Sequence, residues 1–291
     1  VQETQRLKLP FGIAQIGRCF RNEITTGNFT FRSREFDIAE IEYFVKPGED
    51  EKAFEEWLEA WEQFFLDLGL KKENLRRKEH SKKDLAHYSK RTVDIEYKFP
   101  FGWAELAGVA NRTDYDLSRH AKFSGEDLRY FDEQANNKNK YFPYVIEPTL
   151  GIERLLLALL IDGYLEVKGG RTKTTKATKE VEVVLSLNPR IAPIKVAILP
   201  LLKSDRRLVS KAREIYKSLK NHFMCQYDES GSIGRRYRRQ DEIGTPWCVT
   251  VDHQTLEDDT VTIRDRDTME QKRVEVKILA KTIGEYLGMN L

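Results

Sequence analysis

The sequence predicts two folded domains, an N-terminal α+β domain built on an antiparallel sheet and a C-terminal α/β domain. The length of 291 residues exceeds that of one typical domain. Near the N-terminus two strand-like runs are joined by a short turn, which is the pattern of an antiparallel hairpin. Farther along, after a stretch rich in Gly, Thr and basic residues, strand and helix patterns alternate.

The N-terminal hairpin is expected from residues 11–23 and 29–44. Both runs are rich in β-branched and aromatic residues, and the turn between them reads "TTGN". Gly27 and Asn28 in this turn can adopt positive φ angles, which tight hairpin turns require.

A long amphipathic helix is expected between residues 49 and 70, because apolar side chains recur there at steps of three and four. Gly69 is expected to end it after about five turns. We interpret the aromatic stripe as core packing rather than as a ligand site. The stripe consists of Phe54, Trp57, Leu58, Trp61, Phe64, Phe65 and Leu68.

The remaining elements define the expected domains. Residues 92–111 are rich in strand formers, and residues 148–164 predict the end of a strand that runs through Gly151 into a buried helix. We place a first domain at 1–167, a linker at 168–190 and a second domain at 191–291. The second domain is expected to contain a buried strand at 194–202, a helix around Leu208–Leu219 and strands in "WCVTVD" and "TVTIRDRD".

The composition narrows the class of protein. With 40% hydrophobic and 33% charged residues the chain is typical of a globular protein, and it has no apolar run of the length that a membrane span needs. Three widely spaced cysteines argue against a disulfide framework, so we expect a cytoplasmic protein. The net charge of only +2 means that any nucleic-acid binding has to come from local patches.

Charged residues in the predicted hairpin suggest a binding surface. Side chains alternate along a strand, so Arg21 and Glu23 would share one face of the first strand. Their partners on the second strand would be Arg32, Arg34, Phe36, Glu40 and Glu42. One interpretation is a solvated sheet held by cross-strand ion pairs. The other is a site for a nucleoside triphosphate and a small amine, because guanidinium groups bind phosphate, carboxylates accept amines, and an aromatic ring stacks on a base.

These residues resemble known motifs. "FRNE" followed by "RSREF" resembles motif 2 of the class II aminoacyl-tRNA synthetases, and "GIER" before an apolar helix resembles their motif 3. Five longer segments resemble the dimeric glycyl-tRNA synthetases from about residue 5 to about residue 275. They are "RLKLPFGIAQIGRCFRNEI", "FPFGWAELAGVANRTDYDL", "APIKVAILPL", "YDESGSIGRRYRRQDEIGTPWCVTVD" and "DDTVTIRDRDTMEQKRV".

The resemblance implies roles in ATP binding. Arg21 would hold the α-phosphate and the substrate carboxylate, while Arg32 and Arg154 would reach the γ-phosphate; Arg21 and Arg154 are the expected catalytic residues. Glu23 would accept the adenine amino group and Phe36 would stack on the ring. The implied ATP-binding set is Arg21, Asn22, Glu23, Arg32, Ser33, Phe36, Glu105, Leu106 and Arg154. Glu105 would also be associated with the Mg²⁺ that accompanies ATP.

The resemblance also implies a glycine pocket. Glu40 would accept the substrate ammonium group, and "EPT" at Glu147, Pro148 and Thr149 matches the family's "EPS" loop. Thr149 keeps the hydroxyl group and adds a methyl group. Because glycine has no side chain to recognise, selection has to come from steric exclusion and from acceptors for the ammonium group.

Two features of the family have no counterpart in this sequence. The motif 1 helix and strand, which build the family's dimer interface, and an "RPETAQG" segment with a further glycine-binding Glu are absent. We therefore expect the sequence to be a fragment of a longer homodimeric enzyme.

Weaker signals remain. The segment "RRYRRQDE" places Arg235, Arg236, Arg238 and Arg239 around Tyr237, a candidate tRNA-binding patch or a solvated charge run. By the resemblance, residues 191–291 would be an anticodon-binding α/β domain with a mixed sheet. His80, His87 and His120 match no compact zinc-ligand spacing, so no zinc site is expected.

The function predicted from the sequence is that of a glycine–tRNA ligase, which makes glycyl-adenylate from glycine and ATP with Mg²⁺ and passes glycine to tRNA(Gly). No membrane partner is expected. Two alternatives stay open: a non-catalytic relative that binds nucleic acid, of the polymerase accessory type, or a class II synthetase for threonine or proline.

Overall fold

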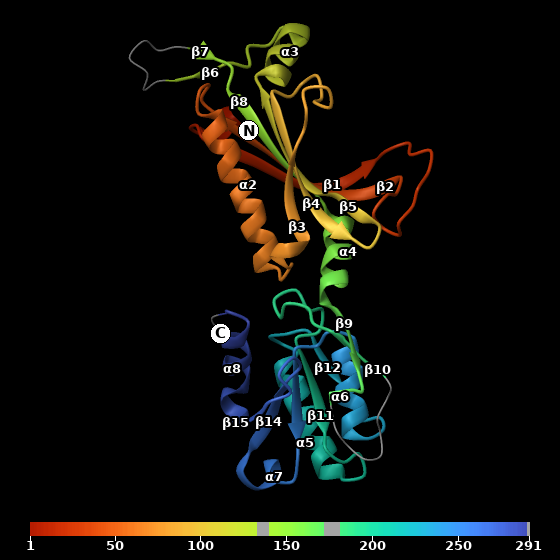
Figure 1. The fold of residues 1–291 in the computed structure, drawn as a ribbon. Helices are drawn as coiled ribbons and strands as arrows, with labels where there is room; N and C mark the ends of the chain where they lie inside the picture. Colours follow the sequence, from red (N-terminus) through yellow and green to blue (C-terminus); the bar gives the residue numbers. More distant parts are fainter. Residues whose placement is uncertain (133–139, 172–180, 290–291) are drawn as a thin grey trace. The chain divides into compact units, whose positions relative to one another are not determined.

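The computed structural model describes residues 1–132, 140–171 and 181–289. The chain divides into two compact units, Val1–Ala158 and Leu159–Leu291, with the boundary inside helix α4 (Figure 1). Within the described ranges, no helix combines the length and apolarity that crossing a membrane requires. The assignment of domains at 1–167 and 191–291 with a linker between them stays a prediction.

The first unit is built on a six-stranded sheet. Every neighbouring pair of strands is antiparallel, as the sequence predicted. The strand order is β1 (Phe11–Phe20), β2 (Glu35–Val45), β8 (Tyr144–Gly151), β5 (Gly102–Thr113), β4 (Arg91–Phe99) and β3 (Leu75–Glu79).

The predicted N-terminal strands were too long at the turn. β1 ends at Phe20 and β2 begins at Glu35, so the residues between them form a loop rather than a tight hairpin. This loop is closed by the Arg21 amide, which donates to the Arg34 carbonyl at 2.9 Å, and by an isolated bridge between Gly27 and Arg32. The motif residues in it are therefore held by loop geometry and not by strand alternation.

The predicted amphipathic helix is α2 (Asp50–Asp67), which packs against β5 and β8. Phe54, Leu58 and Phe65 are buried, and Trp61 stacks on Phe65 with ring centres 5.8 Å apart. Gly69, with φ at +100°, follows the helix end as expected. The stripe is thus core, and α2 covers part of the sheet.

Two further helices, α3 and α4, and several short elements complete the description of the first unit up to the boundary within α4. α4 (Ile152–Gly163) starts directly after β8, as predicted, but it is less buried than the sequence suggested, because Leu156 is 52% exposed. α3 (Tyr115–Ser124) follows β5. The short elements are α1 (Gln2–Gln5), η1 (Lys72–Asn74), β6 (Tyr130–Phe131) and β7 (Lys140–Tyr141).

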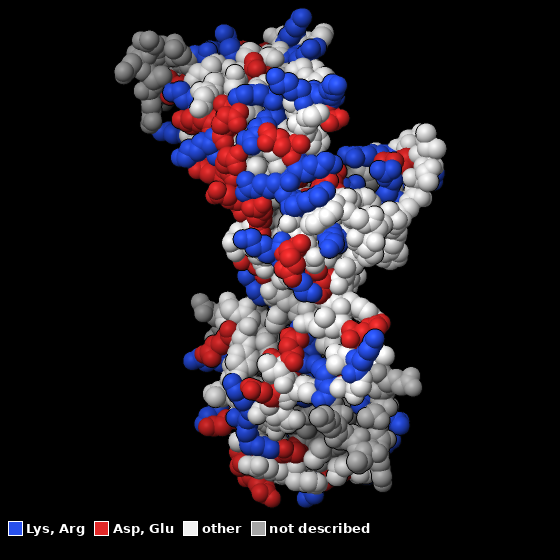
Figure 2. Space-filling model, in the orientation of Figure 1, with Lys and Arg blue, Asp and Glu red and all other residues white. Residues whose placement is uncertain are grey.

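Charged side chains of both signs are mixed over α2, β3 and β4 (Figure 2). Arg77 pairs with Glu55 and Glu62, and Arg91 pairs with Glu55 and Glu79. Because acidic and basic groups neutralise one another here, this face does not present a field of one sign.

The second unit contains a mixed five-stranded sheet, which confirms the predicted α/β class. β12 (Cys225–Tyr227), β11 (Val196–Pro200) and β13 (Trp247–Val251) are parallel, whereas β14 (Thr260–Asp265) and β15 (Gln271–Glu275) are antiparallel to their neighbours. Its helices are α5 (Arg206–Leu219), α6 (Ile233–Glu242), α7 (Thr255–Asp258), η2 (Val276–Ile278) and α8 (Leu279–Tyr286).

A separate two-stranded sheet opens the second unit. β9 (Tyr164–Lys168) pairs antiparallel with β10 (Val181–Leu185), so parts of the segment predicted as linker are strand. Residues 172–180 of that segment lie outside the described residues. Val196, Ile198, Leu208, Val249 and Ile283 belong to the core between the five-stranded sheet and its helices.

Candidate active site

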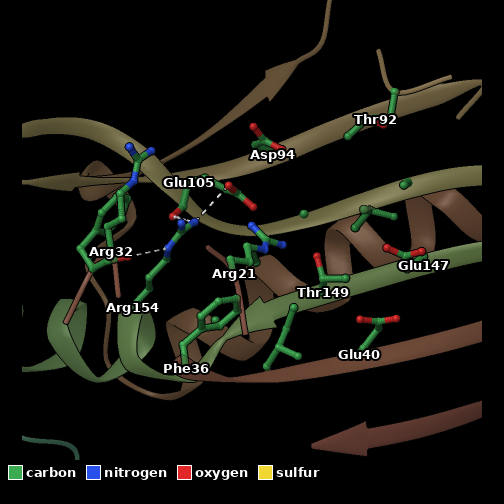
Figure 3. A pocket seen from close by; sticks show the side chains of 18 of the residues that line it. Arg21, Arg32, Phe36, Glu40, Thr92, Asp94, Glu105, Glu147, Thr149 and Arg154 are labelled. Carbon is green, nitrogen blue, oxygen red and sulfur yellow. Dashed lines mark hydrogen bonds and ion pairs between the residues drawn. The ribbon is translucent and has the colours of Figure 1, made fainter. Parts of the chain in front are cut away.

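A pocket of about 300 Å³ lies on the sheet of the first unit (Figure 3). Its floor is one row of residues across four strands: Glu40 on β2 lies opposite Thr149 on β8, which lies opposite Gly108 on β5, which lies opposite Asp94 on β4. Adjacent antiparallel strands bring such opposite residues to about 5 Å, so these side chains can act on one small molecule.

One wall of the pocket is the loop between β1 and β2. Arg21, Glu23 and Arg32 line the pocket from this loop, whereas the sequence predicted all three on strand faces. Arg34 instead holds the loop, because its Nε donates to the Glu23 carbonyl at 2.9 Å. The guanidinium carbon of Arg21 lies 5.2 Å from the centre of the Phe36 ring, a cation–π contact.

Arg154 enters the pocket from the first turn of α4. Its Nη1 lies 3.0 Å from a carboxylate oxygen of Glu105, and its Nε donates to the Phe31 carbonyl at 3.3 Å (Figure 3). The preceding Gly151 makes room for this side chain, since a Cβ there would lie 3.3 Å from Arg154 Cδ. Glu153 fixes the helix start by accepting the Asp37 amide at 2.9 Å.

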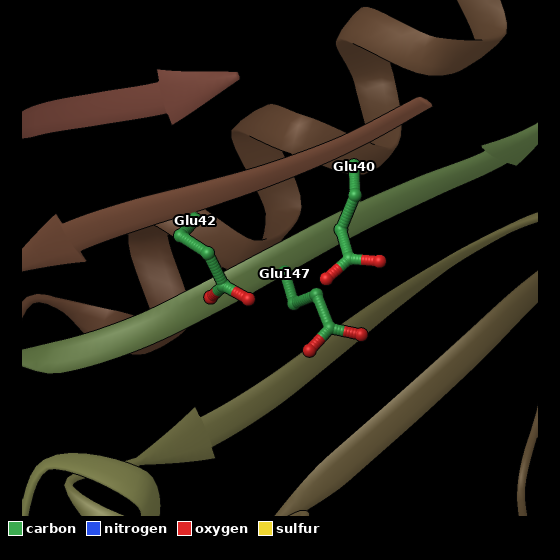
Figure 4. Close-up of side chains that lie close together, drawn as sticks. All are labelled: Glu40, Glu42 and Glu147. Atoms are coloured by element: carbon green, nitrogen blue, oxygen red, sulfur yellow. The ribbon is translucent and has the colours of Figure 1, made fainter. Parts of the chain in front are cut away.

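The other end of the pocket is acidic. Glu40 and Glu147 line this end, and Glu42 lies next to them without lining the pocket. One carboxylate oxygen of each lies within 4.8 Å of the others, which suits a single positively charged group (Figure 4). Glu147 is paired with Arg112 at 2.5 Å. Burial, reinforced by the charge of Glu147, raises the pKa of Glu42 to about 7.

Some site residues were missed by the sequence reasoning. His80 lines the pocket, and its Nε2 lies 2.8 Å from Oδ2 of Asp94. Burial raises the pKa of the Asp94 carboxyl group, with the His80 contact acting against it. Tyr88 and Arg112 stack with 4.1 Å between the guanidinium carbon and the ring centre. Glu42 was noted in the hairpin. Arg112 was given no role, because its link to the acidic end runs through Glu147, which is distant in the sequence, while its other partner, Asp116, lies only four residues away.

The pocket brings together most of the predicted site residues. Those that line it are Arg21, Glu23, Arg32, Ser33, Phe36, Glu40, Glu105, Glu147, Thr149 and Arg154. Asn22, Leu106 and Pro148 do not line it. Leu106 is 1% exposed and Pro148 is buried, because neighbours of pocket-facing residues on β5 and β8 point to the other face of the sheet. The side chains of Leu106 and Pro148 therefore do not face the pocket, and the roles that the resemblance implies for these three residues stay predictions.

The candidate tRNA-binding patch on α6 also needs a correction. Arg236 is 1% exposed, and its guanidinium group donates to the carbonyls of Pro200 and Gly231. Burial lowers its pKa. It cannot contact a nucleic acid as predicted. Arg239 pairs with Asp228, and Arg235 is exposed, so the patch is smaller than its sequence suggests.

Comparison with known families fits this geometry. Residues 2–162 match the model of the tRNA synthetase class II core domain (G, H, P, S and T), and residues 195–286 match the anticodon binding domain. The chain belongs to the class II tRNA synthetase core family. Motifs 2 and 3 of the family resemblance accordingly correspond to the loop wall and the Arg154 helix of the pocket.

Similar curated proteins are named glycine–tRNA ligase. The one from Clostridium acetobutylicum is 55% identical over 289 residues, which are 99% of this chain and 60% of that protein. Those from Geobacillus kaustophilus and Thermobifida fusca are 54% and 51% identical over 99% of this chain and 60% and 62% of their own lengths. The chain thus spans about 60% of the length of the relatives that it matches.

In this class II synthetase core, the two ends of the pocket carry opposite charges. Arg21, Arg32 and Arg154 line one end, and Glu40 and Glu147 line the other. Such an arrangement can bind a polyphosphate at the cationic end while an amine occupies the acidic end, with the reacting groups between them.

Proposed function

We propose that this chain is the ATP-binding and anticodon-binding part of a glycine–tRNA ligase, which activates glycine as glycyl-adenylate and transfers it to tRNA(Gly). The observation that carries the proposal is the pocket floor on one antiparallel sheet, with arginines at one end and clustered glutamates at the other. The identity to relatives named glycine–tRNA ligase supports the choice of amino acid.

ATP occupies the arginine end. Arg21 binds the α-phosphate and the glycine carboxylate, while Arg32 and Arg154 bind the γ-phosphate. The adenine ring takes the position on Phe36 that the Arg21 guanidinium group now occupies, and Glu23 accepts the adenine amino group. Arg154 exchanges its contacts with Glu105 and Phe31 for phosphate oxygens.

The reaction needs positioning and neutralisation of charge more than a protein nucleophile. The glycine carboxylate attacks the α-phosphorus in line, pyrophosphate leaves, and the arginines stabilise the developing charge. The residues present fit Mg²⁺ held mainly by ATP phosphates, because Glu105 offers a half-exposed carboxylate beside Arg154. When bound there, Mg²⁺ supplies further neutralisation of the phosphate charge.

Glycine occupies the acidic end. Glu40 and Glu147 accept the ammonium group, and the Thr149 hydroxyl lies beside them on the floor. Gly108 leaves space on this floor, since a Cβ there would lie 3.5 Å from Thr149 Oγ1 and 3.6 Å from Asp94 Oδ1. The remaining room fits glycine, and larger amino acids are excluded sterically.

The second unit binds the anticodon region of tRNA(Gly), which the match to anticodon binding domains supports. A homodimeric assembly and a cytoplasmic location belong to the same proposal. They rest on the resemblance and on the three cysteines, which form no disulfide among themselves.

The test is amino-acid-dependent exchange of pyrophosphate into ATP, with glycine compared with alanine, serine, threonine and proline. It is measured on this chain and on a chimera that adds the part of the Clostridium acetobutylicum relative that the chain does not span. Exchange with glycine alone, in either preparation, is the expected result. If threonine or proline supported the exchange instead, that amino acid and not glycine would be the substrate. No exchange in either preparation, with nucleic acid still bound, would support a non-catalytic relative instead.

A further inference from the structure

Arg112 sits beside the acidic end of the pocket without lining it. Its Nε lies 2.6 Å from Asp116 Oδ2, one Nη lies 3.0 Å from Asp116 Oδ1, and the other Nη lies 2.5 Å from Glu147 Oε2. Tyr88 stacks on the guanidinium group at 4.1 Å. A planar group with two carboxylate partners and a ring on its face has little freedom to move, so Glu147 is held in place.

The carboxylates around Arg112 come from three elements. Glu40 and Glu42 belong to β2, Glu147 belongs to β8, and Asp116 belongs to α3. Like charges close together in a partly buried site repel one another, so the cluster tends to take up protons. Among these groups Arg112, from β5, contributes the positive charge.

The electrostatics follow the geometry. Burial, with the charge of Glu147, raises the pKa of Glu42 to about 7, and the charge of Arg112 acts against this rise. Burial also raises the pKa of Glu147, and Arg112 again lowers it. Burial alone would lower the pKa of Arg112, but the hydrogen bonds that it donates to Asp116 and the negative charge of Glu147 outweigh burial and raise that pKa. Arg112 therefore stays charged while its neighbours titrate.

We propose that Arg112 is a positioning residue for the ammonium end of the pocket: it fixes the Glu147 carboxylate and supplies the positive charge that lets Glu147 and Glu42 be ionised side by side. The inference rests on the proposed function, because it takes the substrate ammonium group as the occupant of the Glu40–Glu42–Glu147 cluster. Asp116 opposes Arg112, since its negative charge raises the pKa of both Glu42 and Glu147.

The test is the pH dependence of KM for glycine in pyrophosphate exchange, with KM for ATP measured in parallel. Ionised glutamates bind an ammonium group better than neutral ones do. In the unmodified protein KM for glycine therefore falls as the pH rises through about 7. Arg112→Met removes the positive charge, so it raises KM for glycine about tenfold or more at neutral pH and moves the fall to higher pH. Arg112→Lys keeps the positive charge without the planar group, so we expect its KM for glycine to lie between that of Arg112→Met and that of the unmodified protein.

Asp116→Asn gives the decisive contrast. It keeps the size of the side chain and a hydrogen-bonding oxygen, but it removes a negative charge, so the fall in KM moves to lower pH, opposite to Arg112→Met. A merely structural role cannot move the two profiles in opposite directions. Arg119→Met is the matched control, because Arg119 is an exposed arginine on α3 that stacks on Tyr115 at 4.7 Å.

The outcomes separate the inference from the function on which it rests. If neither this chain nor the chimera shows glycine-dependent exchange, the proposed function fails; the variants are made in the preparation that is active. If it does exchange, but Arg112→Met and Asp116→Asn shift the profile in the same direction or leave it in place, the role of Arg112 is overturned. Equal changes in KM for glycine and for ATP would also overturn it. Asp116→Asn and Arg112→Lys keep the test decisive if Arg112→Met does not fold.

Discussion

In the first unit, Arg21, Arg32 and Arg154 line a pocket, whereas in the second unit the side chains of Arg264 and Arg266 are buried. Arg264 donates to Asp241, and Arg266 donates to the backbone carbonyls of Gly244 and Leu187. The pocket arginines have partners that a ligand can replace, such as the Phe36 ring or the Glu105 carboxylate. The arginines of the second unit have partners that only unfolding removes. We therefore propose that arginine serves recognition in the pocket and stability in the buried network of the second unit.

The buried network of the second unit centres on Asp241, which is 1% exposed. Its Oδ1 lies 2.9 Å from Arg264 and its Oδ2 lies 2.5 Å from Arg171. Arg171 also pairs with Glu182 on β10, so the network joins α6, β14 and the two-stranded sheet. A guanidinium group presents five donors in a rigid fork, which explains why arginine rather than lysine occupies these positions.

The largest expected effect is on this network. Asp241→Asn keeps the size of the side chain but leaves two buried guanidinium charges without their shared counter-charge. We expect it to lower the free energy of unfolding of the second unit by about 3–5 kcal/mol. Urea unfolding followed by the fluorescence of the buried Trp247 measures this loss.

Glu257→Gln is the control, because it makes the same chemical change at an exposed position of the second unit. We expect it to change stability by less than about 0.5 kcal/mol. If Asp241→Asn lowered the free energy of unfolding by less than about 1 kcal/mol, the network would not be structural. The contrast drawn between the arginines of the two units would then be wrong.

The sequence predicted the parts of the fold that depend on local patterns. The periodicity of residues 49–70 indicated α2, and the alternation of strands and helices after residue 190 indicated the mixed sheet. The prediction that the two N-terminal strands extend to a tight turn was wrong. Residues 21–34 form a loop, which is held by backbone contacts such as that of Arg21 with Arg34 and not by continuous pairing of two strands.

Only those residues of the candidate site that lie in recognisable sequence motifs could be predicted. Residues such as Arg21, Glu40 and Arg154 carry recognisable sequence contexts, and the pocket brings them together. Arg112 acts on Glu147 of another strand, and Asp94 faces the pocket beside His80; the sequence does not reveal such contacts before the register is known. Arg236 showed the converse problem, since an arginine in a basic run looks exposed until its burial is known.

A second prediction tests the pocket arginines. Arg154→Met removes a charge that we place on the γ-phosphate, so it should lower kcat for pyrophosphate exchange by about 10²- to 10³-fold. It should leave tRNA binding within about twofold and the unfolding free energy nearly unchanged, because Arg154 is partly exposed and its partners are the carbonyl and ring of Phe31 and the carbonyl and carboxylate of Glu105.

Arg206→Met is a control for general effects of losing a surface arginine, since Arg206 is exposed at the start of α5. An equal loss of exchange and of tRNA binding in Arg154→Met would contradict the separation of roles. A large loss of stability would show that Arg154 belongs with the buried arginines and not with the recognition arginines.

The smallest expected effects concern α6, where recognition and structural arginines stand side by side. Arg235 is exposed, and we expect Arg235→Ala to weaken tRNA(Gly) binding only a few-fold, with a shallower dependence on salt if a phosphate contact is lost. Arg236→Ala should instead destabilise the second unit, because the carbonyls of Pro200 and Gly231 lose their donors. Filter binding at two salt concentrations, together with urea unfolding, separates these effects.

If Arg236→Ala weakened tRNA binding with its stability intact, burial would not be a sufficient criterion for a structural arginine. If both variants behaved alike in both assays, α6 would act as one unit, and the contrast drawn between the two kinds of arginine would hold between the pocket and this domain but not within it.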